Sequence, residues 1–70
     1  MKVEIIAIGD ELLIGQTIDT NSAWIGEQLN ALSFKMIQVS KIKDEKSRIL
    51  AALDLAESRS DIVLITGGLG

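Results

Sequence analysis

The chain contains no cysteine, histidine or tyrosine, and each absence narrows the chemistry open to its 70 residues. Without cysteine there is no disulfide framework, no thiolate nucleophile and no zinc-finger spacing. Without histidine there is no side chain that ordinarily titrates near neutral pH, and no serine–histidine pair to activate a hydroxyl. Any reaction must therefore use carboxylates, lysines, hydroxyls, backbone amides or a metal ion.

Long apolar runs and basic clusters are also missing. Wholly apolar runs extend for only a few residues, far short of the roughly 20 that a membrane helix needs, and the N-terminus lacks the apolar core of a signal peptide. The net charge is −3 and the basic residues are scattered, which argues against a nucleic-acid surface or an anionic membrane. We expect a cytoplasmic protein that binds neither. Because so short a chain buries little surface, we also expect a homo-oligomer or a part of a longer domain.

Each end of the chain has the pattern of a buried strand that opens into a glycine turn. Residues 62–65 are Ile-Val-Leu-Ile, without polar alternation, which is typical of a strand covered on both faces. They lead into Thr66-Gly67-Gly68-Leu69-Gly70. Residues 3–8 are apolar except for Glu4 and stop at Gly9-Asp10-Glu11. The sequence therefore predicts two central strands, each followed by a loop in which glycine lets the backbone turn tightly.

Two helices and a third strand are predicted between them. Residues 19–21 are good N-cap types, and apolar or small residues recur around and after them at helical spacing: Ile18, Ser22, Ile25, Leu29 and Leu32. We expect these positions to face the sheet. Residues 34–42 mix lysines with apolar side chains, as in a strand at a sheet edge. Asp44 is the predicted cap of the second helix, whose apolar face would comprise Ile49, Leu53 and Ala56.

Alternation of strands and helices indicates an α/β fold with a parallel sheet. Placing the least apolar strand at the edge gives the spatial order second, first, third. Because crossovers are right-handed, the two helices must then cover opposite faces, which gives a three-layer α/β/α domain with a doubly wound, mainly parallel sheet. Ligands of such sheets bind beyond the carboxyl ends of the strands, where the winding direction reverses. We therefore expect Gly9–Glu11 and Thr66–Gly70 to line one crevice.

The glycine segment allows two interpretations. Gly67, Gly68 and Gly70 can present successive backbone N–H groups to a phosphate, with the Thr66 hydroxyl beside them. Equally, the glycines can simply allow a tight turn at the end of the strand, without any ligand. The segment is neither a P-loop nor a GxGxxG motif, which disfavours a standard ATPase or nicotinamide-binding site.

The polar residues between the first strand and the first helix also allow more than one interpretation. Asp10 and Glu11 are paired carboxylates suited to Mg²⁺ or a similar hard cation, or to a sugar hydroxyl, although adjacent acids are also common in solvated turns. Asp19 and Asn21 either cap the first helix or contact a ligand from its N-terminus.

Three segments taken together, Gly9–Gln16, Asp19–Asn21 and Thr66–Gly70, resemble the N-terminal, molybdopterin-binding-like domain of the CinA (competence/damage-inducible) family, which is related to MoaB and MogA. The resemblance covers the whole chain in order. It implies a three-layer α/β/α domain that binds the phosphate of a nucleotide or pterin. In CinA-like members it implies a divalent-metal-dependent pyrophosphatase acting on ADP-ribose or related dinucleotides. Because the family's loop continues past Gly-Gly-Leu-Gly, residues 1–70 would be the N-terminal part of the domain.

The resemblance also assigns expected roles. Asp10 and Glu11 would be catalytic and hold the metal. The substrate would be contacted by Gly9, Asp19, Asn21, Thr66, Gly67, Gly68 and Gly70. Two alternatives use the same crevice: an enzyme of molybdenum-cofactor biosynthesis that binds molybdopterin, and a non-catalytic module that binds a nucleotide or pterin. In each case the expected partner is a small molecule that contains phosphate.

Overall fold

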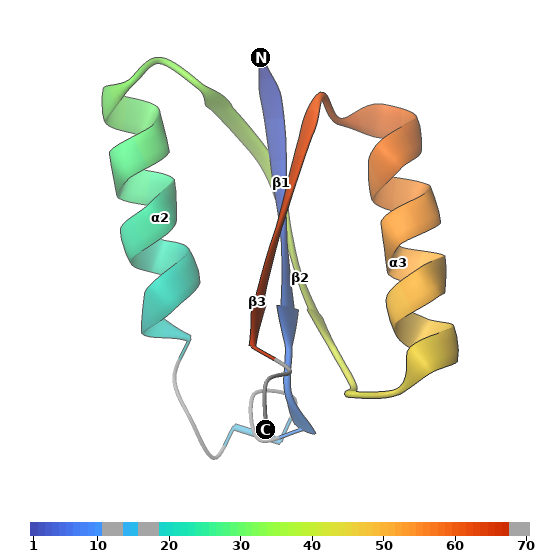
Figure 1. Ribbon diagram of the computed structural model, residues 1–70. Helices are drawn as coiled ribbons and strands as arrows, with labels where there is room; N and C mark the ends of the chain where they lie inside the picture. The colour runs from blue at the N-terminus through green and yellow to red at the C-terminus, as the bar shows by residue number, and fades with distance from the viewer. Residues whose placement is uncertain (11–13, 16–18, 68–70) are drawn as a thin grey trace.

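The computed structural model describes residues 1–10, 14–15 and 19–67 of the chain. Strands and helices alternate through this part of the sequence (Figure 1). In order they are β1 (Lys2–Ile8), α2 (Thr20–Ala31), β2 (Lys35–Ile42), α3 (Lys46–Arg59) and β3 (Ile62–Gly67). Neither described helix has the length and apolar character needed to cross a membrane.

The three strands form a parallel sheet in the order β2-β1-β3. Helix α2 covers one face of this sheet and α3 covers the other (Figure 1). The sequence-based prediction of a doubly wound α/β/α arrangement is therefore confirmed, including the edge position of the strand with the most polar pattern. All three strands run in the same direction, so their carboxyl ends lie along one edge of the sheet.

Strand β1 supplies most of the fully buried core. Its side chains alternate between the two faces, because the repeat of a strand is two residues. Ile6 and Ile8 pack against Ala56 of α3, while Val3, Ile5 and Ala7 lie on the other face and are completely inaccessible to solvent. Partly buried side chains complete the α3 side: Ile42, Ile49, Ala52, Leu53 and Val63. The predicted apolar face of the second helix is thus confirmed.

The two helices begin in different ways. Asp19 caps α2, because its Oδ1 accepts a hydrogen bond from the Ser22 N–H at 3.0 Å. At the start of α3 the capping position belongs to Glu45, whose side chain makes no capping bond, and the helix begins at Lys46. The prediction that Asp44 caps this helix is wrong by one residue.

Helix α2 ends in a Schellman motif. Ser33 has a positive φ of 68° and its N–H donates to the carbonyl of Asn30 at 3.0 Å, while the N–H of Phe34 donates to the carbonyl of Leu29 at 3.0 Å. Leu32 consequently lies at the C-cap, where it is 68% exposed. The prediction that Leu32 faces the sheet is wrong, because the chain has already left helical geometry.

Glu4 is a buried charge in the middle of the apolar strand β1, with 1% of its surface exposed. Its carboxylate accepts two hydrogen bonds from the Arg59 guanidinium, each at 2.8 Å, and a third from the Ser60 hydroxyl at 3.0 Å. Arg59 lowers the pKa of Glu4 most, and Ser60 adds to this, while burial acts in the opposite direction. A buried carboxylate needs such partners, because an unpaired one is very costly.

We predict that Glu4→Gln destabilises the fold at neutral pH by roughly 1–3 kcal/mol, the usual range for lost hydrogen bonds to a charged group. Because folding lowers the pKa of Glu4, this stabilisation is present above the ordinary pKa of a glutamate. It is lost as the pH falls through the lowered value in the folded state. Thermal unfolding of the full-length gene product should therefore show a gap between wild type and variant that closes in acid. Glu57→Gln, which removes an exposed carboxylate of α3, is the control; an equal loss there would contradict the assignment.

Gly67 ends β3 with a positive φ of 82°. A Cβ at this position would press directly on the carbonyl oxygen of Ile8 in the neighbouring strand. Both the conformation and the close approach therefore require glycine.

We expect Gly67→Ala to cost at least about 2 kcal/mol, from the strained φ together with the overpacking against Ile8. Gly26→Ala is the matched control, because a Cβ at Gly26 in α2 meets nothing within 4 Å. That change should stabilise the helix by about 0.5–1 kcal/mol. Unfolding midpoints of the two variants should move in opposite directions, and a shared direction would show that local packing is not the cause.

Candidate functional site

The register of the sheet brings the two predicted loops to one edge. Ile8, the last residue of β1, pairs with Ile42 of β2 on one side and with Gly67 of β3 on the other. Gly9 and Asp10 follow directly from the central strand, so they leave the sheet beside Gly67 (Figure 1). Three of the predicted site residues fall outside the described part of the chain: Glu11, Gly68 and Gly70.

Gly9 extends the hydrogen-bond ladder of the sheet. Its N–H donates to the carbonyl of Ile42 at 3.1 Å. In this arrangement the amide is committed to β2 and does not point at a phosphate. On the β3 side of the edge, Gly67 has the positive φ that a nest of N–H groups uses.

Asp10 is exposed and has a partner that the sequence did not reveal. Its Oδ1 accepts a hydrogen bond from the backbone N–H of Asp44 at 3.1 Å, which ties the segment after β1 to the loop before α3. A topological signal for this contact did exist, because Asp10 and Asp44 both follow the carboxyl ends of neighbouring parallel strands. The backbone N–H of Asp44 therefore holds the Asp10 carboxylate in place.

The donor chemistry at Asp10 suits a hard cation. A carboxylate oxygen is a preferred ligand of Mg²⁺, which in enzymes is often held by one or two carboxylates together with phosphate oxygens of the substrate. Among the described residues, no group of three or more acidic, histidine or cysteine side chains gathers closely enough to hold a metal alone. A metal held at Asp10 would therefore need further ligands, such as the phosphate oxygens of a substrate.

Asp19 lies against β2. It borders a hollow of about 450 Å³ between α2 and β2, together with Ser22, Ala23, Val39 and Lys41. Burial raises the pKa of Asp19, but the side chain and N–H of Ser22 and the charge of Lys41 outweigh it, so the pKa is lowered overall. Its Oδ2 is buried and has no hydrogen-bond partner in the described structure. Asp19 acts as the helix cap, and its near neighbours belong to β2 and not to β3.

The other described candidates lie on α2 and β3. Asn21 is exposed in the first turn of α2. Thr66 pairs with Ala7 of β1 and directly precedes Gly67 at the carboxyl edge. Of the described candidates, the sheet register therefore groups Gly9, Asp10, Thr66 and Gly67 at one edge, whereas Asp19 and Asn21 belong to the start of α2.

Known proteins support this reading of the fold. The family model for the probable molybdopterin binding domain matches residues 4–70. The chain is 46% identical over all 70 residues to a CinA-like protein of Flavobacterium psychrophilum, and 49% identical over 67 residues to one of Cytophaga hutchinsonii. A crystal structure of the protein CinA, of unknown function, from Thermoplasma acidophilum superposes with a TM-score of 0.94 at 33% identity over 99% of this chain.

These relatives are much longer than the region they share with this chain. The 70 residues correspond to 17% of the Flavobacterium protein, 16% of the Cytophaga protein and 41% of the Thermoplasma chain. Within that region the match is continuous, and the strand order and helix positions agree with the solved structure. The chain therefore belongs to the family of probable molybdopterin binding domains, with CinA-like proteins among its relatives.

Proposed function

We propose that the protein containing this chain hydrolyses a nucleotide pyrophosphate, ADP-ribose or a related dinucleotide, with the help of a divalent metal. The observation that carries this proposal is the pairing of Ile8 with Gly67, which sets Asp10 and the glycine exit of β3 at one edge of the sheet. Hydrolysis of a pyrophosphate needs both groups together: a carboxylate to hold a cation, and donors to hold phosphate oxygens.

In this proposal Asp10 and Glu11 hold the metal, which when bound would stabilise negative charge at phosphorus and lower the pKa of a bound water. The Asp44 N–H engages Oδ1 of Asp10 and so orients the carboxylate, leaving Oδ2 for the cation. Gly67 and the glycines that follow it in the sequence would supply N–H groups to phosphate, and Thr66 would add a hydroxyl beside them. Asp19 and Asn21 support the substrate from the start of α2.

We predict that Asp10→Asn lowers the metal-dependent turnover of ADP-ribose by roughly 10²–10³-fold, a usual loss when one electrostatic contact to the transition state is removed. The amide oxygen of asparagine can still accept the Asp44 N–H, so the loop stays tied while the charge is lost. Glu11→Gln should behave in the same way.

Turnover should be measured on the full-length gene product over a range of Mg²⁺ concentrations. Asp54→Asn, which removes an exposed carboxylate of α3, is the matched control and should retain full activity. Unchanged turnover in both Asp10→Asn and Glu11→Gln would contradict the assignment of the metal site.

The second candidate is binding of molybdopterin in molybdenum-cofactor biosynthesis, and it is favoured by the description of the matching family. The two candidates differ in what the purified protein retains. Pterin fluorescence in the purified full-length protein, without hydrolysis of ADP-ribose, would favour the second. Binding of nucleotide or pterin without any turnover would instead indicate a non-catalytic module.

A further inference from the structure

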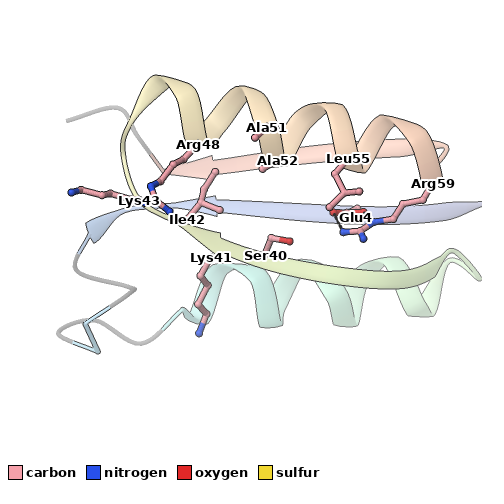
Figure 2. A pocket seen from close by; sticks show the side chains of 10 residues that line it. All are labelled: Glu4, Ser40, Lys41, Ile42, Lys43, Arg48, Ala51, Ala52, Leu55 and Arg59. Carbon is pink, nitrogen blue, oxygen red and sulfur yellow. Dashed lines mark hydrogen bonds and ion pairs between the residues drawn. The ribbon is translucent and has the colours of Figure 1, made fainter.

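A hollow lies between α3 and the edge strand β2, on the face of the sheet opposite α2. We call it the α3–β2 groove. Its volume is about 620 Å³, within the range of roughly 300–1,000 Å³ that is typical of small-molecule sites. Figure 2 shows α3 as one wall of the groove and β2 along its floor. Its Ile42 and Lys43 end reaches the carboxyl edge of the sheet, where Asp44 is bonded to Asp10, and its other end, at Glu4 and Arg59, lies toward the amino edge.

Small side chains leave this space open. Ala51 and Ala52 of α3 line the wall, and Ser40 of β2 lies on the floor, between Ile42 at one end and Glu4 at the other (Figure 2). Leu55 extends the apolar wall and remains 55% exposed. The groove thus offers an apolar wall next to one hydroxyl that can both donate and accept a hydrogen bond.

One end of the groove is already neutralised within the chain. Arg59 lies there with both of its engaged nitrogens directed at Glu4, whose carboxylate also accepts from Ser60 (Figure 2). These bonds occupy the carboxylate and fix the guanidinium. A ligand gains little by competing for this end.

The other end carries a cation with only a weak partner. Arg48 is 66% exposed there, and its Nε lies 3.9 Å from Oε2 of Glu45. Lys43, close by, is 3.9 Å from the same oxygen, although Figure 2 shows its ammonium group directed away from the groove. Exposed pairs at this distance are weak. The outer nitrogens of Arg48 make no hydrogen bond within the described part of the chain, so they can engage a ligand.

Arg48 supplies the positive charge that is available at the groove. Of the other basic residues that line it, Lys41 points to the α2 side, where it borders the hollow beside Asp19, Lys43 points away, and Arg59 is paired with Glu4 (Figure 2). A cation without a strong partner beside an apolar wall attracts a ligand that carries an anionic group.

We propose that the α3–β2 groove binds a nucleoside phosphate, with the phosphate on Arg48 and the base along the wall formed by Ala51 and Leu55. A guanidinium matches phosphate geometry through two parallel hydrogen bonds. A planar, mostly apolar base suits a slot with one apolar wall and a single hydroxyl, Ser40, to meet its polar edge. This inference goes beyond the proposed hydrolysis, because it needs no metal and places the base along α3, away from the glycine exit of β3.

Photolabelling tests the location directly. The full-length gene product is irradiated with 8-azidoadenosine monophosphate in the presence of a chelator, and the labelled peptides are identified by mass spectrometry. We expect the label within residues 40–55, and we expect AMP to compete for it. A label confined to residues 9–15 or 66–70 would place the base at the loops after β1 and β3 and overturn the proposal.

Affinity for AMP in matched variants tests the chemistry. Arg48→Glu should weaken AMP binding at least about tenfold, since it removes a charged hydrogen bond to phosphate. Ala51→Phe should weaken binding to a similar degree by filling the groove. Lys46→Glu and Leu50→Phe change neighbouring residues of α3 that do not line the groove, and both should leave AMP binding unchanged.

Two results would contradict the proposal even if AMP binds. An equal loss in Lys46→Glu and Arg48→Glu would show that the attraction is general and not due to the groove. Equal affinity for inorganic phosphate and AMP would show that the base makes no contact. The outcome is separable from that of the proposed function, because Asp10→Asn should strongly lower the turnover of ADP-ribose and leave the labelling of residues 40–55 intact.

Discussion

The structure depends on the pairing of β1 with a parallel strand on each side. This arrangement buries the strand's apolar residues and satisfies its backbone groups from both neighbours. It also sets the register in which Ile8 meets Ile42 and Gly67, and so determines which loop residues share an edge. Because β1 is apolar on both faces, the charge of Glu4 marks the register: a shift of one residue would turn Glu4 away from Arg59 and leave a buried carboxylate without its partner.

The two edges of the sheet have different uses. At the amino edge, two hydrogen bonds join the starts of β1 and β3. The N–H of Lys2 donates to Oδ2 of Asp61 at 2.8 Å, and the N–H of Asp61 donates to the carbonyl of Lys2 at 2.9 Å. The Glu4–Arg59 pair lies toward the same end. At the carboxyl edge the described ties are the Gly9 and Asp44 amides, which brace the start of the loops. Stability is thus concentrated away from the edge where we place the chemistry.

The topology followed from the sequence because it rests on patterns that are local and repeated. Continuous apolar runs indicated β1 and β3, and lysines indicated the edge strand β2. The right-handedness of the crossovers then placed the two helices on opposite faces of the sheet. The spacing rule failed at Leu32 because helical periodicity carries no signal for the point at which Ser33 adopts a positive φ. That point depends on carbonyls being satisfied at the helix end.

The contacts that the sequence could not predict join distant residues. Glu4 and Arg59 are 55 positions apart, and Asp10 and Asp44 are 34 apart. Neither residue of such a pair carries a local mark of its partner, because the contact exists only after the sheet has assembled. The α3–β2 groove is likewise a product of assembly, since alanines on a helix indicate an opening only when the strand opposite them is known. The roles of Glu11, Gly68 and Gly70 stay predictions.

The position of β1 in the sheet has a consequence during synthesis. Val3 is made early, yet its partner Ile62 lies 59 residues later. At roughly 5–20 residues per second, the ribosome needs several seconds to supply it. Neither parallel partner can pair through a short hairpin, because each crossover must first form its helix. The most fully buried strand of the chain is therefore synthesised before both of its partners, and its apolar side chains have no sheet to pair with until β2 and β3 have been made.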